Sequence, residues 1–280
     1  MRSYAYCKEY LPALAEILRK AGEIIRNAHR NAEAIGVREK AAEATHVNFV
    51  TAYDTQVQFF LKEQLLRLLP DATFYAEEAG EQNGNTAAGD CFVIDPIDGT
   101  ANFIRDYRTS AISVALLHDG IPVLGTIYDP YGEILYTAVR GEGACRNGVP
   151  MHVSQTPTDA SLILIGTAPY YKEELGERTL SATRALLLHC ADLRRSGSAA
   201  LDLAAVACGC MDGFFEARLS PWDYAAGALL ITEAGGTVTD ASGQPLRYDR
   251  PCSVLAGNAC NYPTLAKLIQ NSDSTEEKTS

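Results

Sequence analysis

The sequence has 280 residues, of which 47% are hydrophobic and 21% charged, and its formal net charge at pH 7 is −11. This composition is typical of soluble globular proteins, and the chain is long enough for one large domain or two modest ones. The acidic balance argues against nucleic acid as the main partner, because neutralising a phosphate backbone requires a basic surface.

Targeting and cysteine patterns exclude further classes. No stretch approaches the roughly 18 consecutive apolar residues of a membrane span, and the opening MRSYAYCKEY lacks the apolar core of a secretory signal. We therefore expect a cytoplasmic protein without a membrane partner. The eight cysteines include no CxxC pair and mostly have apolar neighbours, which favours reduced, buried thiols over disulfides. No Cys/His pair has zinc-ligand spacing.

The first half of the chain is predicted to hold two helices and an antiparallel meander. Apolar residues of 11–28 fall on one side of a helix, and 51–69 reads as a second helix that ends at Pro70. The polar segment 31–46 has weak periodicity, and we expect a mobile loop there. Turns are predicted at 119–120 and 147–148. Strand-like runs occur at 74–76, 91–94, 110–117, 122–128 and 133–139.

The second half alternates between strands and helices. Four strands are predicted, at 161–166, 213–217, 237–239 and 253–256. Four helices are predicted, at 180–189, 198–210, 221–234 and 263–270. We therefore place a soft boundary near residue 150, with an N-terminal α+β domain over 1–150 and a C-terminal α/β domain over 151–270. The polar end of the chain, 271–280, is predicted to be a disordered tail.

The most informative segment follows the apolar run 91–94 and reads DPIDGT over residues 95–100. An apolar strand that ends in two acids three positions apart places Asp95 and Asp98 at the rim of a sheet. Pro96 fixes its own φ and pushes Asp95 towards an extended conformation. A helix starting at Gly99 would turn unpaired N–H groups to the same place, which favours an anion. Because carboxylates repel phosphate unless cations lie between them, the segment predicts a metal-bridged phosphate site.

Each acid also has an ordinary structural explanation. Asp98 could cap a helix, an acid pair such as Glu77–Glu78 is common on surfaces, and the helix dipole favours Asp223 in a first helical turn. The functional hypothesis therefore depends on Glu77, Asp95, Asp98 and Asp223 converging in space.

A set of carboxylates without nearby His or Cys points to Mg²⁺ rather than Zn²⁺. Paired ions of this kind can activate water, so no covalent nucleophile is required. No GxSxG elbow supports a serine hydrolase, and no GxxxxGK[ST] loop supports a P-loop kinase.

Two long motifs make the chain resemble the inositol monophosphatase family, part of a larger lithium-sensitive, metal-dependent sugar-phosphatase superfamily. DPIDGTANF at 95–103 is similar to the first family signature, and PWDYAAG at 221–227 with EAGG at 233–236 is similar to the second. Shorter segments fit in the expected order: VTAYD at 50–54, EE at 77–78 and RSGSAA at 195–200. The resemblance implies an α+β fold, a layered αβαβα sandwich of the inositol monophosphatase / fructose-1,6-bisphosphatase type, assembled as a homodimer.

The resemblance also implies a set of metal ligands for two to three Mg²⁺ ions. Glu77, Asp95 and the backbone carbonyl of Ile97 would hold a first ion. Asp95, Asp98 and Asp223 would hold a second, and Glu77 would help to seat a third, weaker ion through water.

Catalytic and substrate roles follow from the same resemblance. Thr100 together with Glu77 would position the attacking water, with Asp54 supporting Thr100. The backbone amides of Gly99 and Thr100 would bind the phosphate. The remaining substrate contacts would come from Asp98, Ala199 (through its backbone), Glu216 and Asp223.

The implied activity is that of an inositol-phosphate phosphatase, which hydrolyses myo-inositol monophosphate to inositol and phosphate with metal-activated water. Two alternatives stay open: the same chemistry on fructose-1,6-bisphosphate, 3′-phosphoadenosine 5′-phosphate, NADP or histidinol phosphate, or a catalytically silent regulatory binding protein. The chain departs from the family where Ala76 precedes Glu77, a position at which many relatives have Gly. Lys40 could be the family's mobile-loop lysine, but 31–46 aligns poorly, so Lys40 is given no role.

Overall fold

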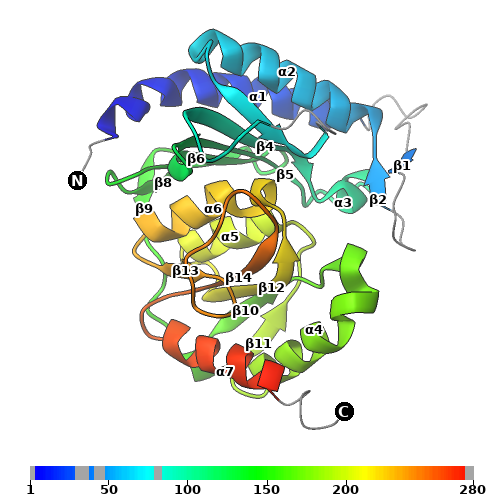
Figure 1. Cartoon of the computed structure of the whole chain (residues 1–280), viewed down its shortest axis with the longest axis vertical. Helices are drawn as coiled ribbons and strands as arrows, with labels where there is room; N and C mark the ends of the chain where they lie inside the picture. The colour runs from blue at the N-terminus through cyan, green and yellow to red at the C-terminus, as the bar shows by residue number, and fades with distance from the viewer. Residues whose placement is uncertain (1–3, 29–37, 41–47, 79–83, 275–280) are drawn as a thin grey trace.

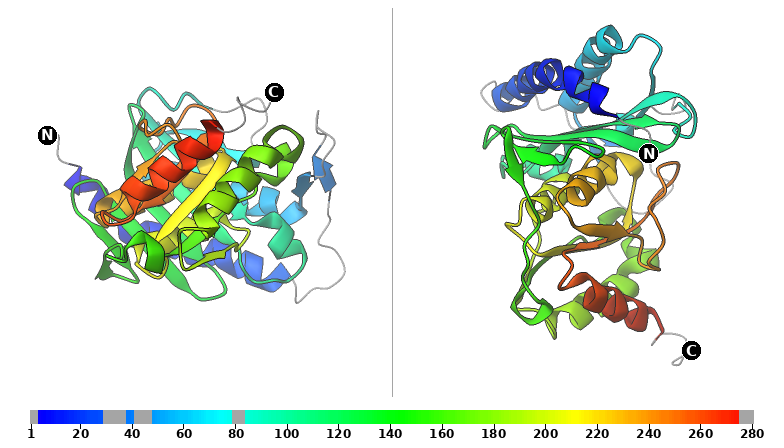
Figure 2. Two further views of the ribbon diagram at one scale, coloured as in Figure 1. Left: turned by 90° about the horizontal axis from the view of Figure 1, so that it is seen from below. Right: turned by 90° about the vertical axis from the view of Figure 1, so that its left-hand side faces the viewer.

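The computed structural model describes residues 4–28, 38–40, 48–78 and 84–274. Its elements form five stacked layers in which helices alternate with two β-sheets (Figure 1), and the side view in Figure 2 shows the same order. This is the αβαβα sandwich that the sequence predicted. In the part of the chain that is described, no helix combines the length and the apolar character needed to cross a membrane.

The larger sheet has seven strands in the order β3-β4-β5-β6-β7-β8-β9. β3 pairs parallel with β4, and every later pair is antiparallel. Asp119 and Gly120 form the tight turn between β5 and β6, with φ values of 49° and 80° that suit a two-residue hairpin. The strands are β3 (Thr73–Ala76), β4 (Asp90–Asp98), β5 (Ala111–His118), β6 (Ile121–Asp129), β7 (Ile134–Val139), β8 (Ala144–Arg146) and β9 (Val149–Met151).

The smaller sheet has five strands in the order β11-β10-β12-β14-β13. β10 runs parallel to both of its neighbours, whereas β14 is antiparallel to both of its own. The strands are β10 (Leu162–Ile165), β11 (Asp192–Arg194), β12 (Gly213–Leu219), β13 (Thr237–Thr239) and β14 (Cys252–Gly257).

Three pairs of helices make up the other layers, and the central pair packs against both sheets. Short elements complete the fold: β1 (Arg38–Lys40) pairs antiparallel with β2 (Asn48–Val50), and α3 (Thr100–Ile104) follows β4. The helix pairs are α1 (Leu11–Ala28) with α2 (Ala52–Leu68), α5 (Ala199–Ala207) with α6 (Pro221–Glu233), and α4 (Lys172–Leu187) with α7 (Tyr262–Ser274).

Three apolar cores hold the layers together. One lies between α1, α2 and the seven-stranded sheet and includes Leu18 and Leu61. A second surrounds α5 and α6 and includes Leu203 and Tyr224, and a third lies under α4 and α7 and includes Leu186. Burying one such side chain stabilises the fold by roughly 1.5–3 kcal/mol. The central helices are therefore fixed from both sides, and the chain segments at their ends are fixed with them.

Most of the predicted elements are confirmed, but several predictions are wrong in their bounds. α4 begins at Lys172 rather than at residue 180. Its first two turns are polar and therefore lack the apolar pattern on which the prediction depends. α7 continues to Ser274, so 271–274 are helical and do not belong to a tail. Within the segment predicted as a mobile loop, 38–40 form a strand. The rest of that segment, and residues 275–280, lie outside the described residues.

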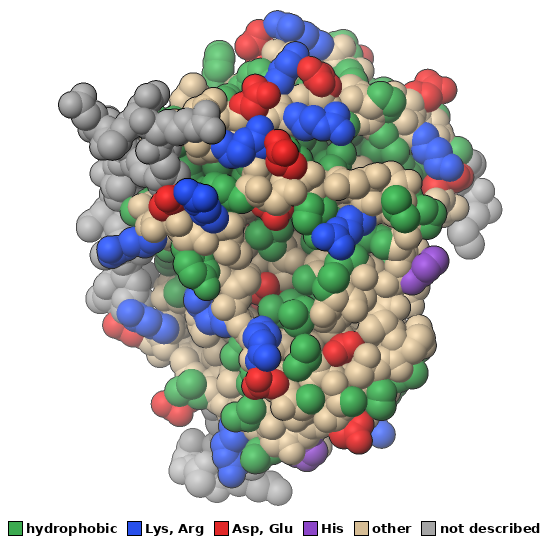
Figure 3. Space-filling model, turned by 180° about the vertical axis from the view of Figure 1, so that it is seen from behind, with side chains coloured by type: hydrophobic (Ala, Val, Ile, Leu, Met, Phe, Trp, Pro, Cys, Tyr) green, Lys and Arg blue, Asp and Glu red, His purple; other side chains and the backbone are tan. Residues whose placement is uncertain are grey.

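The chain passes from the larger sheet to the smaller one between Met151 and Leu162, next to the boundary proposed from the sequence. Because both sheets pack against α5 and α6, the division into two domains stays a prediction. Over the face displayed in Figure 3, acidic and basic side chains are interspersed among apolar ones.

Candidate functional site

Strand β4 carries the two acids of the DPIDGT segment into the interior. The strand does not end at Ile94, as the sequence predicted, but continues to Asp98. Asp95 pairs with Ser113, and the register then shifts before Asp98 pairs with Ala111. Pro96 lies within this bulge, where it has no N–H to lose from the ladder. Asp95 is 2% exposed and Asp98 8% exposed, so the sheet itself fixes both carboxylates.

The third acid comes from the start of α6. Ser220 and Asp223 form a capping box in which the Ser220 N–H donates to Asp223 Oδ2 at 2.7 Å. One oxygen atom from each of Asp95, Asp98 and Asp223 lies within 4.8 Å of the others. The structure thus brings Asp223 next to two acids that precede it by more than a hundred residues in the sequence.

Main-chain hydrogen bonds orient these carboxylates. Asp95 Oδ1 accepts from the Ile97 N–H at 3.0 Å. Asp98 Oδ2 accepts from the Ala200 N–H at 2.7 Å and from Ser198 Oγ at 2.5 Å. Since Ser198 also caps α5, the N-terminus of α5 holds Asp98, an acid of the seven-stranded sheet. In each side chain one oxygen is engaged by these bonds, and the other can serve as a ligand of fixed direction.

The electrostatics of the cluster fit a divalent cation. Burial raises the pKa of Asp98 to about 6, although the bonds from Ser198 and Ala200 lower it. Burial also raises the pKa of Asp95 and of Asp223 well above the usual range, and the neighbouring acids raise both further. A positive charge among the three carboxylates would offset the free-energy cost of keeping them ionised in this position. Since the group contains oxygen donors alone, it suits a hard cation such as Mg²⁺.

Glu77 and Ile97 lie beside this group. Glu77 is half-buried at the end of β3, and its charge is among the causes that raise the pKa of Asp95, Asp98 and Asp223. Its side chain lies outside the group of three oxygens within 4.8 Å. The carbonyl of Ile97 accepts a hydrogen bond from Thr100 Oγ1 at 3.1 Å. Both residues line the cavity described below.

Thr100 and Asp54 are joined by a direct contact. Thr100 Oγ1 donates to Asp54 Oδ1 at 3.3 Å, and the other oxygen of Asp54 accepts from Thr51 in the capping box of α2. Gly99 precedes Thr100 with φ of 89°, and a Cβ there would lie 3.0 Å from the Thr109 carbonyl oxygen. The turn that leads into α3 therefore requires glycine.

One cavity of about 280 Å³ connects the predicted residues. Glu216, on β12 and 6% exposed, accepts from the Ala168 N–H at 2.8 Å, and burial raises its pKa to about 7. A Cβ on Gly166 would lie 1.8 Å from Glu216 Oε2, so glycine makes room for this carboxylate. Asp54 stands behind Thr100 and does not line the cavity. The predicted residues that do are Glu77, Asp95, Ile97, Asp98, Gly99, Thr100, Ala199, Glu216 and Asp223.

Sequence reasoning missed Asp202, which lines the same cavity from α5. The side chain is 4% exposed, and burial raises its pKa to about 8. The one available signal was an isolated acid in the otherwise apolar run AALDLAAVA at 199–207.

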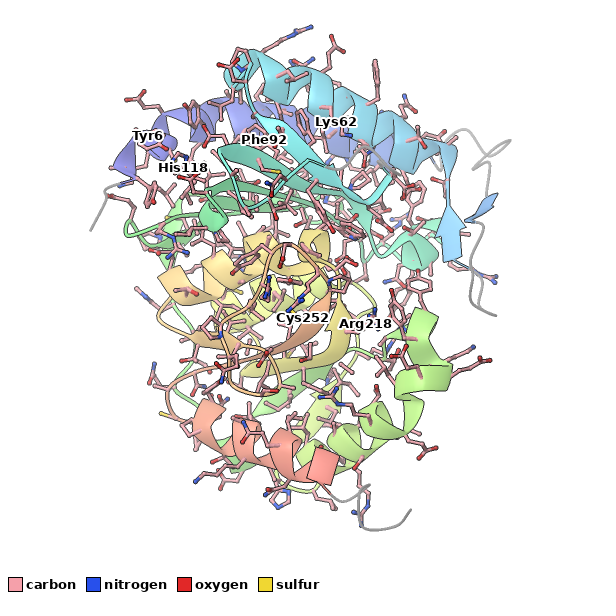
Figure 4. The ribbon with its side chains drawn as sticks, viewed as in Figure 1. Tyr6, Lys62, Phe92, His118, Arg218 and Cys252 are labelled. Carbon is pink, nitrogen blue, oxygen red and sulfur yellow. The ribbon has the colours of Figure 1, made fainter. Side chains whose placement is uncertain are left out.

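A second omission is the rim formed by Tyr170, Tyr171, Arg195 and Arg218. Figure 4 labels Arg218, whose guanidinium lies 4.2 Å from the centre of the Tyr171 ring and pairs with Glu174 of α4 at 3.5 Å. Arg195 Nε donates to Thr167 Oγ1 at 3.2 Å. The sequence did not indicate this rim, because its residues come from three separate places: a 3₁₀ helix before α4, the segment after β11, and β12.

Comparison with known proteins agrees with this geometry. Residues 7–274 match the inositol monophosphatase family. The chain is 38% identical over 240 residues to Nus factor SuhB of Escherichia coli (strain K12), which covers 86% of this chain and 88% of that protein. The structure of inositol monophosphatase from Anabaena (Nostoc) sp. PCC 7120 is similar with a TM-score of 0.83 and 33% identity, over 95% of this chain and 97% of that one.

Two further similar structures contain a bound ligand. SaIMPase-II bound to inositol monophosphate has a TM-score of 0.81 and 25% identity, over 98% of this chain and 100% of that one. SaIMPase-II bound to 2′AMP has a TM-score of 0.75 and 28% identity, over 96% and 99% of the two chains.

Proposed function

The chain belongs to the inositol monophosphatase family, and from this premise we propose that it is a magnesium-dependent phosphatase whose main substrate is myo-inositol monophosphate. The observation that supports the proposal most strongly is the convergence of Asp95, Asp98 and Asp223 in a cavity that also holds Thr100 and Glu216. A group of carboxylate oxygens, of which two belong to buried acids and one to a half-buried acid, suits Mg²⁺. A phosphate ester is the substrate that such ions commonly bind.

Two to three Mg²⁺ ions would be held by the side chains of Glu77, Asp95, Asp98 and Asp223 and by the carbonyl of Ile97. Bound there, they would neutralise phosphate oxygens and lower the pKa of a water molecule. The main-chain bonds to Asp95, Asp98 and Asp223 support this assignment, because they fix the ligand oxygens before any cation arrives.

Thr100 would position the attacking water together with Glu77. The Thr100 hydroxyl has a single proton, and Asp54 and the Ile97 carbonyl both accept it. The oxygen of Thr100 is then left as an acceptor for a proton of the water. Asp54 thus determines the direction of this hydroxyl without touching the substrate.

The substrate would be bound from both halves of the chain. The N–H groups of Gly99 and Thr100 would face the phosphate. Glu216 would accept hydrogen bonds from vicinal hydroxyls of the inositol ring, and Asp98, Asp223 and the backbone of Ala199 would complete the contacts. Glu216 is suited to this task because the Ala168 N–H holds one of its oxygens at 2.8 Å.

Release of inorganic phosphate from a panel of esters, with and without Mg²⁺, tests the proposal. The panel comprises myo-inositol monophosphate, fructose-1,6-bisphosphate, 3′-phosphoadenosine 5′-phosphate, NADP and histidinol phosphate. Asp95→Asn should abolish release, whereas Asp212→Asn, which changes a buried acid outside the cavity, should not. A preference of about tenfold for another ester, roughly 1.4 kcal/mol in the barrier, would overturn the inositol assignment. Absence of release from every ester would overturn the phosphatase assignment.

The arginine and tyrosine rim favours a second class of substrate. An inositol ring carries no charge beyond its phosphate, whereas a nucleotide offers a planar base for Tyr170 and Tyr171 and, in some cases, a second phosphate for Arg195 or Arg218. SaIMPase-II has been solved with 2′AMP. Including 2′AMP in the panel, with Tyr170→Ala as the variant, separates the two readings, because only nucleotide hydrolysis should slow.

A non-catalytic role is the remaining alternative, since the relative with 38% identity is named a Nus factor. If the protein acted in this way alone, Asp95→Asn would leave its function in the cell intact while phosphate release was lost. The complete set of acids together with Thr100 favours catalysis.

The homodimer that the family resemblance implies also remains a proposal. Light scattering on the purified protein should then give twice the chain mass of 30.2 kDa. A mass equal to one chain at micromolar concentration would contradict it.

A further inference from the structure

Two cysteines beyond the C-terminal end of α5 form a dithiol at the protein surface. Cys208 is the C-cap of α5, Cys210 follows two positions later, and their Sγ atoms lie 3.3 Å apart. Cys208 is half-buried and Cys210 is exposed. Neither lines the cavity described above, which α5 approaches with its other end. Among the described residues, no other cysteine donates a hydrogen bond to a second thiol.

The turn between the two cysteines fixes this geometry. Gly209 has φ of 72°, and a Cβ there would lie 2.9 Å from the carbonyl oxygen of His152. The Cys210 N–H donates to the Ala205 carbonyl at 3.0 Å, which ties the turn back to the helix. The backbone therefore keeps both thiols on the same side of the turn, within reach of each other.

The two thiols differ in their exposure to solvent. Burial, followed by the contact with Cys210, raises the pKa of Cys208 to about 11, and nearby Arg146 lowers it only in part. Cys208 is therefore protonated near pH 7, and its S–H has two acceptors within reach, Cys210 Sγ at 3.3 Å and the Ala205 carbonyl oxygen at 3.5 Å. Cys210, by contrast, is open to solvent. An exposed thiol backed by a shielded one is the arrangement in which the outer sulfur reacts first and the inner sulfur completes the exchange.

We propose that Cys208 and Cys210 form a thiol–disulfide exchange site for a small disulfide of the oxidised-glutathione class. In the first step Cys210 loses its proton to water, and its sulfur attacks one sulfur of the small disulfide, whose S–S bond breaks and releases one thiolate. In the second step Cys208 loses its proton to water and attacks Cys210 Sγ, which breaks the mixed disulfide and releases the second thiolate; each released thiolate then takes up one proton from water. The small disulfide gains two electrons and becomes two thiols, and the protein pair loses two electrons and becomes one disulfide.

The second step requires only a small movement of the two sulfur atoms. The sulfur atoms must move from 3.3 Å to the roughly 2.05 Å of an S–S bond, a change within the range of side-chain rotation. A disulfide that is both exposed and closed over a tight turn belongs to the easily reduced class. Excess thiol should therefore reopen it, and the site would respond reversibly to the surrounding ratio of thiol to disulfide.

The test uses the full-length, fully reduced protein under native conditions. After incubation with excess oxidised glutathione and an acid quench, mass spectrometry follows the tryptic peptide 196–218, which contains these two cysteines and no others. The peptide should lose two hydrogens and carry no glutathione, and dithiothreitol should reverse the change. The proposal is overturned if the peptide stays reduced or keeps a bound glutathione.

Two single variants test the order of the steps. Cys208→Ser should trap one glutathione on Cys210, because the second attack is no longer possible. Cys210→Ser should take up none at Cys208 in the same time. A Cys208→Ser protein without an adduct would overturn the assignment of Cys210 as the attacking thiol. Cys260→Ser is the matched control: that thiol is exposed and contacts Gln155, so its loss should leave the 196–218 result unchanged.

Discussion

Replacing Asp98 by asparagine should stabilise the metal-free protein while abolishing its activity. In the folded state Asp98 is 8% exposed and its pKa is raised from 3.8 to about 6, first of all by burial. The folded protein thus binds the proton more tightly than the unfolded chain does. Because this is an acid with a raised pKa, stability falls as pH rises from about 4 to about 6, and the full cost applies above that range. Asparagine resembles the protonated side chain and avoids the cost.

The magnitude follows from the shift. A change of about two pKa units at about 1.36 kcal/mol each gives on the order of 3 kcal/mol above pH 7, as an upper value. The gain should fall to about half at pH 5, where Asp98 of the parent protein is already largely protonated when folded. Saturating Mg²⁺ should reverse the order of stability, because the parent protein gains binding energy that the variant lacks.

Urea unfolding at pH 7.5 and pH 5, in EDTA and in Mg²⁺, measures these differences. Asp212→Asn is the matched control: Asp212 is also 8% exposed, and it accepts bonds from Ser154 and the Leu162 N–H away from the cluster. That variant should lose stability at both pH values. If Asp98→Asn were no more stable than the parent protein in EDTA at pH 7.5, or if the gain were the same at pH 5, the argument from buried, mutually repelling carboxylates would be refuted.

Substitutions at three residues around the cavity give further predictions. Thr100→Ala should lower kcat by about 10²-fold or more without moving the Mg²⁺ midpoint, and Thr100→Ser should restore most of the rate; a normal kcat in Thr100→Ala would exclude a role in positioning water. Ser198→Ala removes the 2.5 Å bond to Asp98 and should raise the Mg²⁺ concentration for half-maximal activity about tenfold, and an unchanged midpoint would count against orientation by α5. Glu216→Gln should raise KM about tenfold for inositol monophosphate but not for p-nitrophenyl phosphate. Because burial raises the pKa of Glu216 to about 7, the KM of the parent protein for inositol monophosphate should rise below that pH as the acceptor is protonated, and the variant should lack this rise.

Elements with a strong local pattern could be predicted from the sequence. α1 has the predicted bounds because its apolar residues form one continuous stripe. The sequence pattern predicts too late a start for α4, because its first turns, Lys172 to Arg178, are mostly polar. Contacts with the rest of the fold are not visible in a local pattern. The pattern also predicts too early an end for β4, because the last residue of this strand, Asp98, pairs with Ala111 of a strand that comes later in the chain.

The site divides in the same way. The acids of DPIDGT and Asp223 could be found because each lies in a motif of recognisable spacing. Asp202 could not be identified in this way, because the role of an acid within an apolar helix depends on the residues around it. Its burial is a property of the whole fold. The rim is a further case, since the stacking of Arg218 on Tyr171 brings together strand β12 and the short 3₁₀ helix before α4, which meet only after folding.

The placement of the acids on different layers has a mechanical consequence. Asp95 and Asp98 belong to one sheet, whereas Asp223 belongs to the neighbouring helix α6, which packs against that sheet largely through apolar side chains. A cation bound by all three carboxylates would hold the sheet and the helix together. Without a cation, repulsion between the carboxylates would push the same two layers apart. Amide hydrogen exchange along the first turns of α6 should therefore slow when cations bind. Occupancy of the site would then also determine how often α6 separates locally from the sheet.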